Sequence, residues 1–238
     1  MKTVVIIGAS GAIGSAITES LARRTDVGAV HAFSRTATTF SDERIVSGFI
    51  DLTDESSIAA AAAAAAKHSP LDLVIVATGI LHTAQFMPEK SLRDLSADAF
   101  GLLFAVNTIG PALAAKHFLP KLKRGERAIF AALSARVGSI SDNRLGGWHA
   151  YRASKAALNM IIRTAAIETA RRAPQAIVVG LHPGTVDSRL SRPFQGNASA
   201  RAIFEPASAA SQLLGVLEAL RPEDSGKCFA YDGQEVLP

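Results

Sequence analysis

The first 24 residues constrain the fold more than any other part of the chain. Residues 3–7 read TVVII, which is almost entirely β-branched and shows no polar alternation. Such runs are typical of a strand that is buried on both faces, as in a parallel sheet. A glycine-rich turn, GASGAIG at 8–14, follows at once, and a helical pattern then continues to Arg24. Strand, glycine turn and helix in this order predict the opening unit of a doubly wound α/β sheet.

The same turn predicts a binding site. Backbone N–H groups at a helix N-terminus attract phosphate, and glycines allow a tight turn and the close approach of a pyrophosphate. An ordinary turn that uses glycine for convenience is the alternative, but the position of this turn at the start of a βαβ unit favours dinucleotide binding. The predicted contacts of the turn are Gly8, Ser10, Gly11, Ala12, Ile13 and Gly14.

The end of the second predicted strand, residues 28–33, bears on the choice of dinucleotide. An acidic residue here would bind the ribose hydroxyls of NAD, whereas this chain has Ser34 and Arg35. A hydroxyl and a guanidinium suit a 2′-phosphate, so the sequence favours NADP(H) over NAD(H). An exposed arginine without a ligand is the alternative at this position.

Strands and helices are predicted to alternate along the whole chain, with no internal repeat and no linker. This pattern predicts a single doubly wound Rossmann-type domain, residues 1–238, with a mostly or wholly parallel sheet of about seven strands flanked by helices. A segment at about 190–204 that contains Pro193 and Gly196 is predicted to form a substrate flap. The later predicted strands are 49–52, 71–78, 127–133, 175–181 and 227–231, and the later helices are 58–67, 92–118, 150–172 and 206–220.

Composition narrows the classes of function. The chain is 48% hydrophobic and 19% charged, so a large core is expected and disorder is not. The net charge of +4 is modest, and no run of Lys or Arg indicates a nucleic-acid or membrane partner. The single cysteine, Cys228, argues against disulfides and multi-cysteine metal sites. We expect no apolar run of membrane-spanning length and no signal peptide, and therefore predict a cytoplasmic protein without a metal.

Four polar residues suggest chemistry. Tyr151 and Lys155 are four apart in a predicted helix, so both side chains leave the same face. A neighbouring ammonium lowers the pKa of a phenol, which makes tyrosine a usable acid or base. Ser134 follows a predicted strand at the edge where parallel sheets bind ligands. Asn107 lies inside a predicted helix, where Asn is unfavourable unless its amide has a task.

Taken together, these segments resemble the short-chain dehydrogenase/reductase family, in its classical form, over essentially the whole chain. The resemblance implies that Tyr151 is the general acid or base and that Lys155 lowers its pKa and binds the nicotinamide ribose. It implies that Ser134 holds the substrate carbonyl. Asn107 and Gly110 match an Asn-x-x-Gly motif whose asparagine anchors a water in a proton relay.

The resemblance also implies further cofactor contacts. These are Asp51 and Leu52 at the adenine, Ala77, Thr78 and Gly79 after the fourth strand, and Pro183, Gly184, Val186 and Ser188 at the nicotinamide amide. Tyr151 and Lys155 also count as cofactor contacts. There are three departures from the family pattern: Val76-Ala77-Thr78-Gly79 replaces Asn-Asn-Ala-Gly, Ser188 replaces a threonine, and Gly138 lies four residues after Ser134, a spacing that puts Ala135 in the serine's place. A one-residue bulge would restore Ser134, and Ser139 is the alternative.

The implied function is an NADP(H)-dependent oxidoreductase that acts on a small carbonyl or alcohol substrate and forms homodimers or homotetramers. The substrate lining is expected from residues 135–149 and 190–204, which include Trp148 and Phe194. A catalytically silent NADP-binding sensor or signalling protein of the same fold is the main alternative. A sugar-nucleotide epimerase is disfavoured, because little chain follows Ser188 to form a substrate domain.

Overall fold

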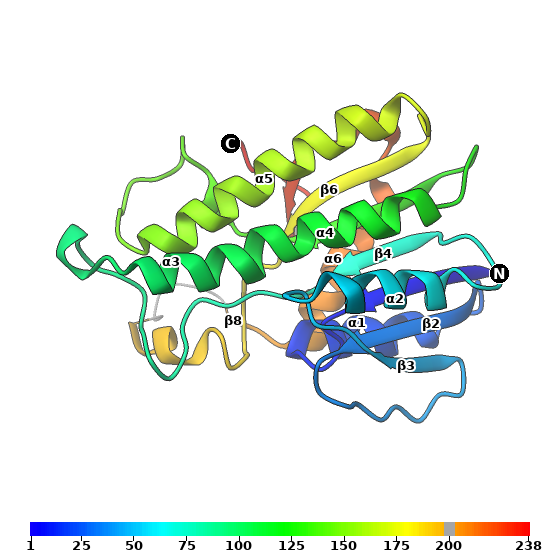
Figure 1. Ribbon diagram of the computed structural model, residues 1–238, viewed down its shortest axis with the longest axis horizontal. Coiled ribbons are helices and arrows are strands. Elements are labelled where there is room, and N and C mark those ends of the chain that lie inside the picture. The colour runs from blue at the N-terminus through cyan, green and yellow to red at the C-terminus, as the bar shows by residue number, and fades with distance from the viewer. Residues whose placement is uncertain (198–202) are drawn as a thin grey trace.

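A seven-stranded parallel sheet forms the centre of the molecule (Figure 1). The computed structural model describes residues 1–197 and 203–238. The strand order is β3-β2-β1-β4-β5-β6-β9, and every pairing within this sheet is parallel. The predicted doubly wound α/β fold is therefore confirmed. The strands are β1 Lys2–Ile7, β2 Val27–Ser34, β3 Ile45–Phe49, β4 Leu73–Val76, β5 Ala128–Leu133, β6 Ala176–His182 and β9 Cys228–Ala230.

Helices cover both faces of the sheet (Figure 1). Val5 and Ile7 of β1 pack with the cluster under one layer of helices, while Val4 and Ile6 pack with the cluster under the other. Because both faces are covered, side chains of β1 that point to either face are buried among apolar neighbours. Apolar residues are therefore favoured at every position, which explains the run without polar alternation. The first layer contains α2 Glu55–Ala65, α4 Gly110–Phe118 and α5 His149–Ala170, and the second contains α1 Ala12–Ala22 and α6 Pro206–Ala219.

One long helical stretch departs from the expectation about membrane-spanning segments. It consists of α3 Ala97–Phe104, a π-helical turn at Ala105–Ile109, α4 and a short 3₁₀ turn at Leu119–Lys121. By length and composition this stretch, Ala97–Lys121, could cross a membrane, so the expectation that no apolar run is long enough was wrong. Its apolar character has a structural reason, because Ala114 and Phe118 are fully buried in the core cluster against the sheet.

The segments that differ from the prediction lie mostly at loops. β3 begins before the predicted third strand and overlaps it only at Phe49, and α2 starts at Glu55 with the Asp54 side chain accepting a hydrogen bond from the Ser56 backbone N–H. A small parallel pair, β7 Thr185–Val186 and β8 Ile203–Phe204, was not predicted. Part of the predicted flap, residues 198–202, lies outside the described residues, and its preceding part forms a 3₁₀ helix at Arg192–Asn197.

Candidate active site

The predicted site residues lie at the carboxyl ends of the central strands. Gly8 follows β1, and Gly79 comes soon after β4. These two strands are neighbours, but the helices that follow them cover opposite faces of the sheet. Ser134 follows β5, and Pro183 follows β6. In a doubly wound sheet, the crevice at this reversal of strand order is where ligands bind. The topology therefore brings the predicted residues to one edge of the sheet.

The glycine turn is tight and leaves no room for additional side chains. Gly8 has a φ of +95°, and a Cβ there would lie 2.8 Å from Thr78 Cγ2. A Cβ on Gly14 would lie 2.2 Å from the Gly8 carbonyl oxygen, so no side chain fits at this crossing. Gly11 is the N-cap residue of α1, and its N–H donates to the Gly8 oxygen at 3.0 Å. These features fit a pyrophosphate at the N-terminus of α1.

Thr78 offers a polar group beside this cradle. Its hydroxyl oxygen is buried and has no hydrogen-bond partner among the residues that the structure describes. A buried hydroxyl without a partner is costly unless a ligand or a water satisfies it. Together with the glycine turn, this orphaned hydroxyl supports the fit of a dinucleotide cofactor at this edge.

The predicted adenosine contacts gather where β2 and β3 end. Ser34 is buried and donates its hydroxyl proton to the Thr36 carbonyl oxygen at 2.5 Å, while Arg35 is exposed. Hydrogen bonds from Thr53 lower the pKa of Asp51, and the positive charge of Arg35 lowers it further. Arg35 and Asp51 are thus neighbours, and the exposed guanidinium has the chemistry to bind an anion.

Tyr151 and Lys155 lie in the first two turns of α5 and are 8% and 2% exposed. The Lys155 ammonium donates to the Leu133 carbonyl oxygen at 2.7 Å and lies 5.9 Å from the centroid of the Tyr151 ring. Burial raises the pKa of Tyr151 to about 12 and lowers the pKa of Lys155 to about 8. Loss of hydration is the cause of the raised tyrosine pKa, and a lowering of that pKa by the Lys155 ammonium stays a prediction.

The Asn107 amide is held from both ends. It lies in the π-helical turn, where the Gly110 N–H bonds to the Ala105 carbonyl oxygen. Its Oδ1 accepts from the Ile80 N–H at 2.9 Å, and its Nδ2 donates to the Ile80 carbonyl oxygen at 2.9 Å. The buried Asn thus has a task, since it pairs with the chain just after β4. Whether it also anchors a water remains a prediction.

Gly79 lies in a loop between the helical turn that carries Asn107 and α5, which carries Lys155. A Cβ on Gly79 would lie 3.4 Å from Lys155 Nζ and 3.5 Å from Asn107 Oδ1. Ser154, which sequence reasoning missed, links the same helices: it accepts from Asn107 Nδ2 at 3.1 Å and donates to the Tyr151 carbonyl oxygen at 2.8 Å. Its only sequence signal was its position next to Lys155.

The structure pairs neither candidate serine with Tyr151. The Ser134 hydroxyl donates to Asn159 Oδ1 at 2.6 Å, and Asn159 lies about 12 Å beyond Tyr151 along the helix axis. The next residue, Ala135, belongs instead to the apolar cluster that contains Tyr151. Ser139 accepts from the Asp142 N–H at 3.1 Å. A role of either serine at the substrate carbonyl therefore stays a prediction.

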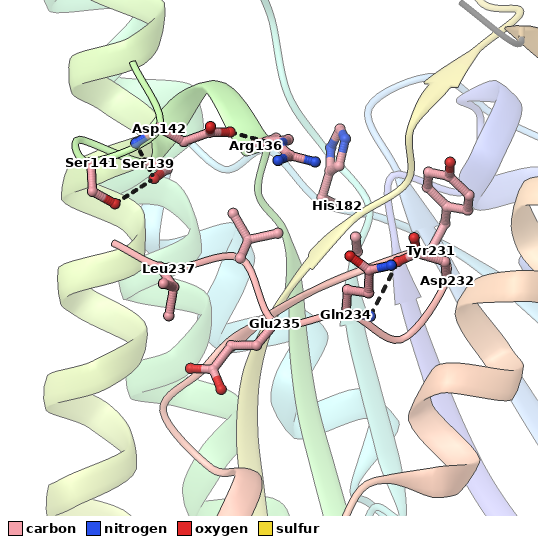
Figure 2. A pocket seen from close by; sticks show the side chains of 12 residues that line it. Arg136, Ser139, Ser141, Asp142, His182, Tyr231, Asp232, Gln234, Glu235 and Leu237 are labelled. Atoms are coloured by element: carbon pink, nitrogen blue, oxygen red, sulfur yellow. Dashed lines mark hydrogen bonds and ion pairs between the residues drawn. The ribbon is translucent and has the colours of Figure 1, made fainter. Parts of the chain in front are cut away.

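A separate cavity of about 340 Å³ lies beside the loop that follows β5 (Figure 2). It is lined by Ser139, by the Arg136–Asp142 ion pair and by His182, toward which Arg136 is directed. Burial, with the nearby Arg136 charge, lowers the pKa of His182 to about 4. His182 is thus neutral at physiological pH.

The predicted nicotinamide segment has a fixed backbone. Gly184 has a φ of +73°, and a Cβ there would lie 2.7 Å from the Phe204 ring. Val186 pairs with Phe204 between β7 and β8, and the Ser188 hydroxyl lies 3.4 Å from the Ser191 hydroxyl. Contacts of these residues with a nicotinamide stay predictions.

Comparisons with known proteins identify the family. The family model of short chain dehydrogenases matches residues 2–198. A dehydrogenase of Rhodococcus sp. (strain AD45), named for 1-hydroxy-2-glutathionyl-2-methyl-3-butene, is 29% identical over 234 residues and is covered, like this chain, to 98%. The C-signal protein of Myxococcus xanthus is 34% identical over 146 residues, which cover 61% of this chain and 82% of that protein.

A solved structure agrees with these relatives. The carbonyl reductase from chicken fatty liver, solved with NADPH bound, has a TM-score of 0.86 and 26% identity, with 100% of this chain and 99% of that chain covered. The resemblance inferred from the sequence motifs is confirmed over nearly the whole chain. The chain belongs to the short-chain dehydrogenase/reductase family and is one of its NAD(P)-dependent oxidoreductases.

Proposed function

We propose that this enzyme is a carbonyl reductase or alcohol dehydrogenase that uses NADP(H), with Tyr151 as the acid or base. The observation that carries the proposal is the convergence of Lys155, Asn107 and Gly79 beside the glycine turn, with Tyr151 buried on the same helix face. A bound nicotinamide would supply or accept the hydride, and the protein supplies orientation and protons.

The cofactor would lie across the switch point of the sheet. The glycine turn and the Thr78 hydroxyl suit its phosphates and ribose, and the exposed Arg35 suits a 2′-phosphate. No carboxylate stands at position 34 or 35 to favour the free ribose hydroxyls of NAD. These features support NADP(H) as the preferred cofactor.

In the reductive direction, Tyr151 binds the substrate oxygen through its phenol proton and then donates that proton as charge develops on the oxygen. The raised pKa of Tyr151 keeps the phenol protonated at neutral pH, which is the form that reduction requires. Lys155, whose pKa is lowered to about 8, would then return a proton to the Tyr151 phenolate and take up another from solvent, while Asn107 holds the backbone just after Gly79 through Ile80. Oxidation needs the phenolate and should therefore be slower at neutral pH.

Replacing Tyr151 with phenylalanine tests the assignment, because only the hydroxyl is removed. We expect NADPH consumption against a panel of aldehydes and ketones to fall by about 10²-fold or more. NADPH binding, measured by calorimetry, should stay within about twofold. Full turnover by Tyr151→Phe would exclude this residue as the acid.

A catalytically silent NADP(H)-binding sensor is the second candidate. Two observations favour it: the Ser134 hydroxyl is engaged by Asn159, and the Lys155 ammonium is engaged by a carbonyl oxygen of β5. Such a protein would bind NADPH with normal affinity and oxidise none with any carbonyl. The same substrate panel therefore separates the two candidates.

We also propose a homodimer or homotetramer that assembles through α4 and α5. Ile109, at the end of the π-helical turn before α4, and Met160 and Ile167 of α5 are 52%, 65% and 50% exposed, and an interface through these helices would bury them. Light scattering of the purified protein would give the mass of the assembly.

A further inference from the structure

Trp148 holds a strained backbone one residue before the helix that carries Tyr151. Its φ of +53° and ψ of +41° make it the only non-glycine with a positive φ among the described residues. Gly146 and Gly147 directly before it also have positive φ, each at 63°, and a third glycine would fit the same path without strain. Backbone strain that a glycine would relieve is kept where the side chain has a function.

Glu89 fixes this strained turn from the other side. Its backbone carbonyl oxygen accepts from the Trp148 N–H at 2.6 Å, and its carboxylate accepts from the Ala150 N–H at 3.4 Å. The Glu89 side chain is only 5% exposed and lies at the N-terminus of α5, where a negative charge is stabilised. Arg152 adds a bond from its Nε to the Gly147 carbonyl oxygen at 3.0 Å. Glu89 and Arg152 thus hold the backbone that carries the indole, and Glu89 acts on the indole as a positioning residue.

The indole belongs to a row of rings that ends at the proposed acid. Its centroid lies 6.3 Å from that of Tyr151 in an edge-on arrangement and 5.1 Å from that of Phe194 in a tilted one. Phe194, in turn, lies edge-on to His82 at 5.7 Å. The four rings come from three segments of the chain that are distant in sequence, because Trp148 and Tyr151 both lie at the start of α5, so this row is a product of the tertiary fold. Leu81 and Leu190 belong to the same apolar cluster as Tyr151, Trp148 and Phe194.

The following inference rests on the proposed function. We propose that Trp148 and Phe194 form an aromatic wall that selects carbonyl substrates in which a planar aryl group adjoins the reacting carbon. A substrate oxygen on the Tyr151 hydroxyl puts the adjoining substituent against the rings that pack on Tyr151. The wall offers ring faces and edges and no charged group, which suits a neutral flat ring. Because Glu89 holds the backbone that carries the indole before a substrate binds, less conformational entropy of the wall is lost on binding.

Trp148 is the only tryptophan of the chain, so its fluorescence reports on this wall alone. The protein saturated with NADP⁺ is titrated with acetophenone and, separately, with methyl cyclohexyl ketone. These ketones have rings of similar size, and no hydride is available, so neither is turned over. We expect acetophenone to bind about three- to tenfold more tightly, which is the selectivity that aromatic pairing provides beyond area.

Phe194→Leu is the matched variant, because it removes one ring of the wall and keeps Trp148. In this variant the two ketones should bind with nearly equal affinity. Phe194→Leu also serves as the control for the light that acetophenone absorbs, because Trp148 is the emitting residue in both proteins. With NADPH, the ratio of kcat/KM for the aryl ketone to that for the cyclohexyl ketone should fall toward one.

The outcomes separate this inference from the proposed function. Equal affinities of the two ketones in the unmodified protein, or no binding of either, would overturn the aromatic wall. Turnover of the cyclohexyl ketone in that case would still leave the reductase intact. An aryl preference in the titration without turnover of any carbonyl would instead refute the proposed function and keep the wall as a binding site.

Discussion

The substitution Ser134→Ala discriminates between two roles of this residue. The sequence predicts that Ser134 contacts the substrate oxygen, whereas in the structure its hydroxyl contacts Asn159. The substitution removes the hydroxyl that bonds to Asn159 Oδ1 at 2.6 Å. Ser134 is 4% exposed, whereas Asn159 is only partly buried. The loss of this part-buried hydrogen bond should cost about 0.5–1.5 kcal/mol of unfolding free energy. In a chain of this length that corresponds to a fall in Tm of about 1–6 °C.

The two roles predict opposite readouts. If Ser134 holds α5 through Asn159, stability falls while kcat/KM stays within about threefold. If Ser134 binds the substrate oxygen, its loss should reduce kcat/KM by about 10²–10³-fold, the cost of one donor at a developing oxyanion. Urea unfolding gives the first quantity, and NADPH consumption with an aldehyde gives the second. The geometry predicts the first outcome.

A double-mutant cycle supplies the control. Asn159→Leu removes the other end of the same bond, so Ser134→Ala should add little in that background if the bond is the whole role. Ala135→Ser places a hydroxyl in the apolar cluster of Tyr151 and should raise kcat/KM. A large catalytic loss in Ser134→Ala with unchanged stability would refute the structural role and support the serine register predicted from the sequence.

Three further predictions concern the buried lysine, the glycine turn and the cofactor. Because the pKa of Lys155 is about 8 in the folded protein, against 10.5 when unfolded, the unfolded chain binds more protons between these values. Stability should thus rise from pH 8 to 10, by at most about 3 kcal/mol, and urea unfolding of Lys155→Met should show no such rise. Gly14→Ala puts a methyl group 2.2 Å from the Gly8 oxygen; it should cost about 1–3 kcal/mol by thermal denaturation, and NADPH should raise the Tm of the variant less than that of the unmodified protein. Arg35→Ala should weaken NADPH binding about 10–100-fold and NADH binding hardly at all by calorimetry, and an equal loss for both would contradict a 2′-phosphate contact.

The sequence predicted the parts of the structure that depend on local pattern. The unalternating run of β1 follows from burial on two faces, and the common helix face of Tyr151 and Lys155 follows from their spacing. The direction of the tyrosine pKa could not be predicted, because it depends on how much of the ring the fold buries. The partner of Ser134 and the contact between Trp148 and Phe194 join segments distant in the chain, so no local pattern reports them.

The π-helical turn at Ala105–Ile109 sets the rotational phase between the helices on either side of it. A π turn contains one residue more than an α-helical turn, so the face of α4 is offset by about 100° from the pattern that α3 would continue. Deleting a single residue there would give a regular helix and turn either Asn107 or the buried Phe118 away from its partners. Helix length in this segment is therefore coupled to the site, and substitutions are tolerated there more readily than insertions or deletions.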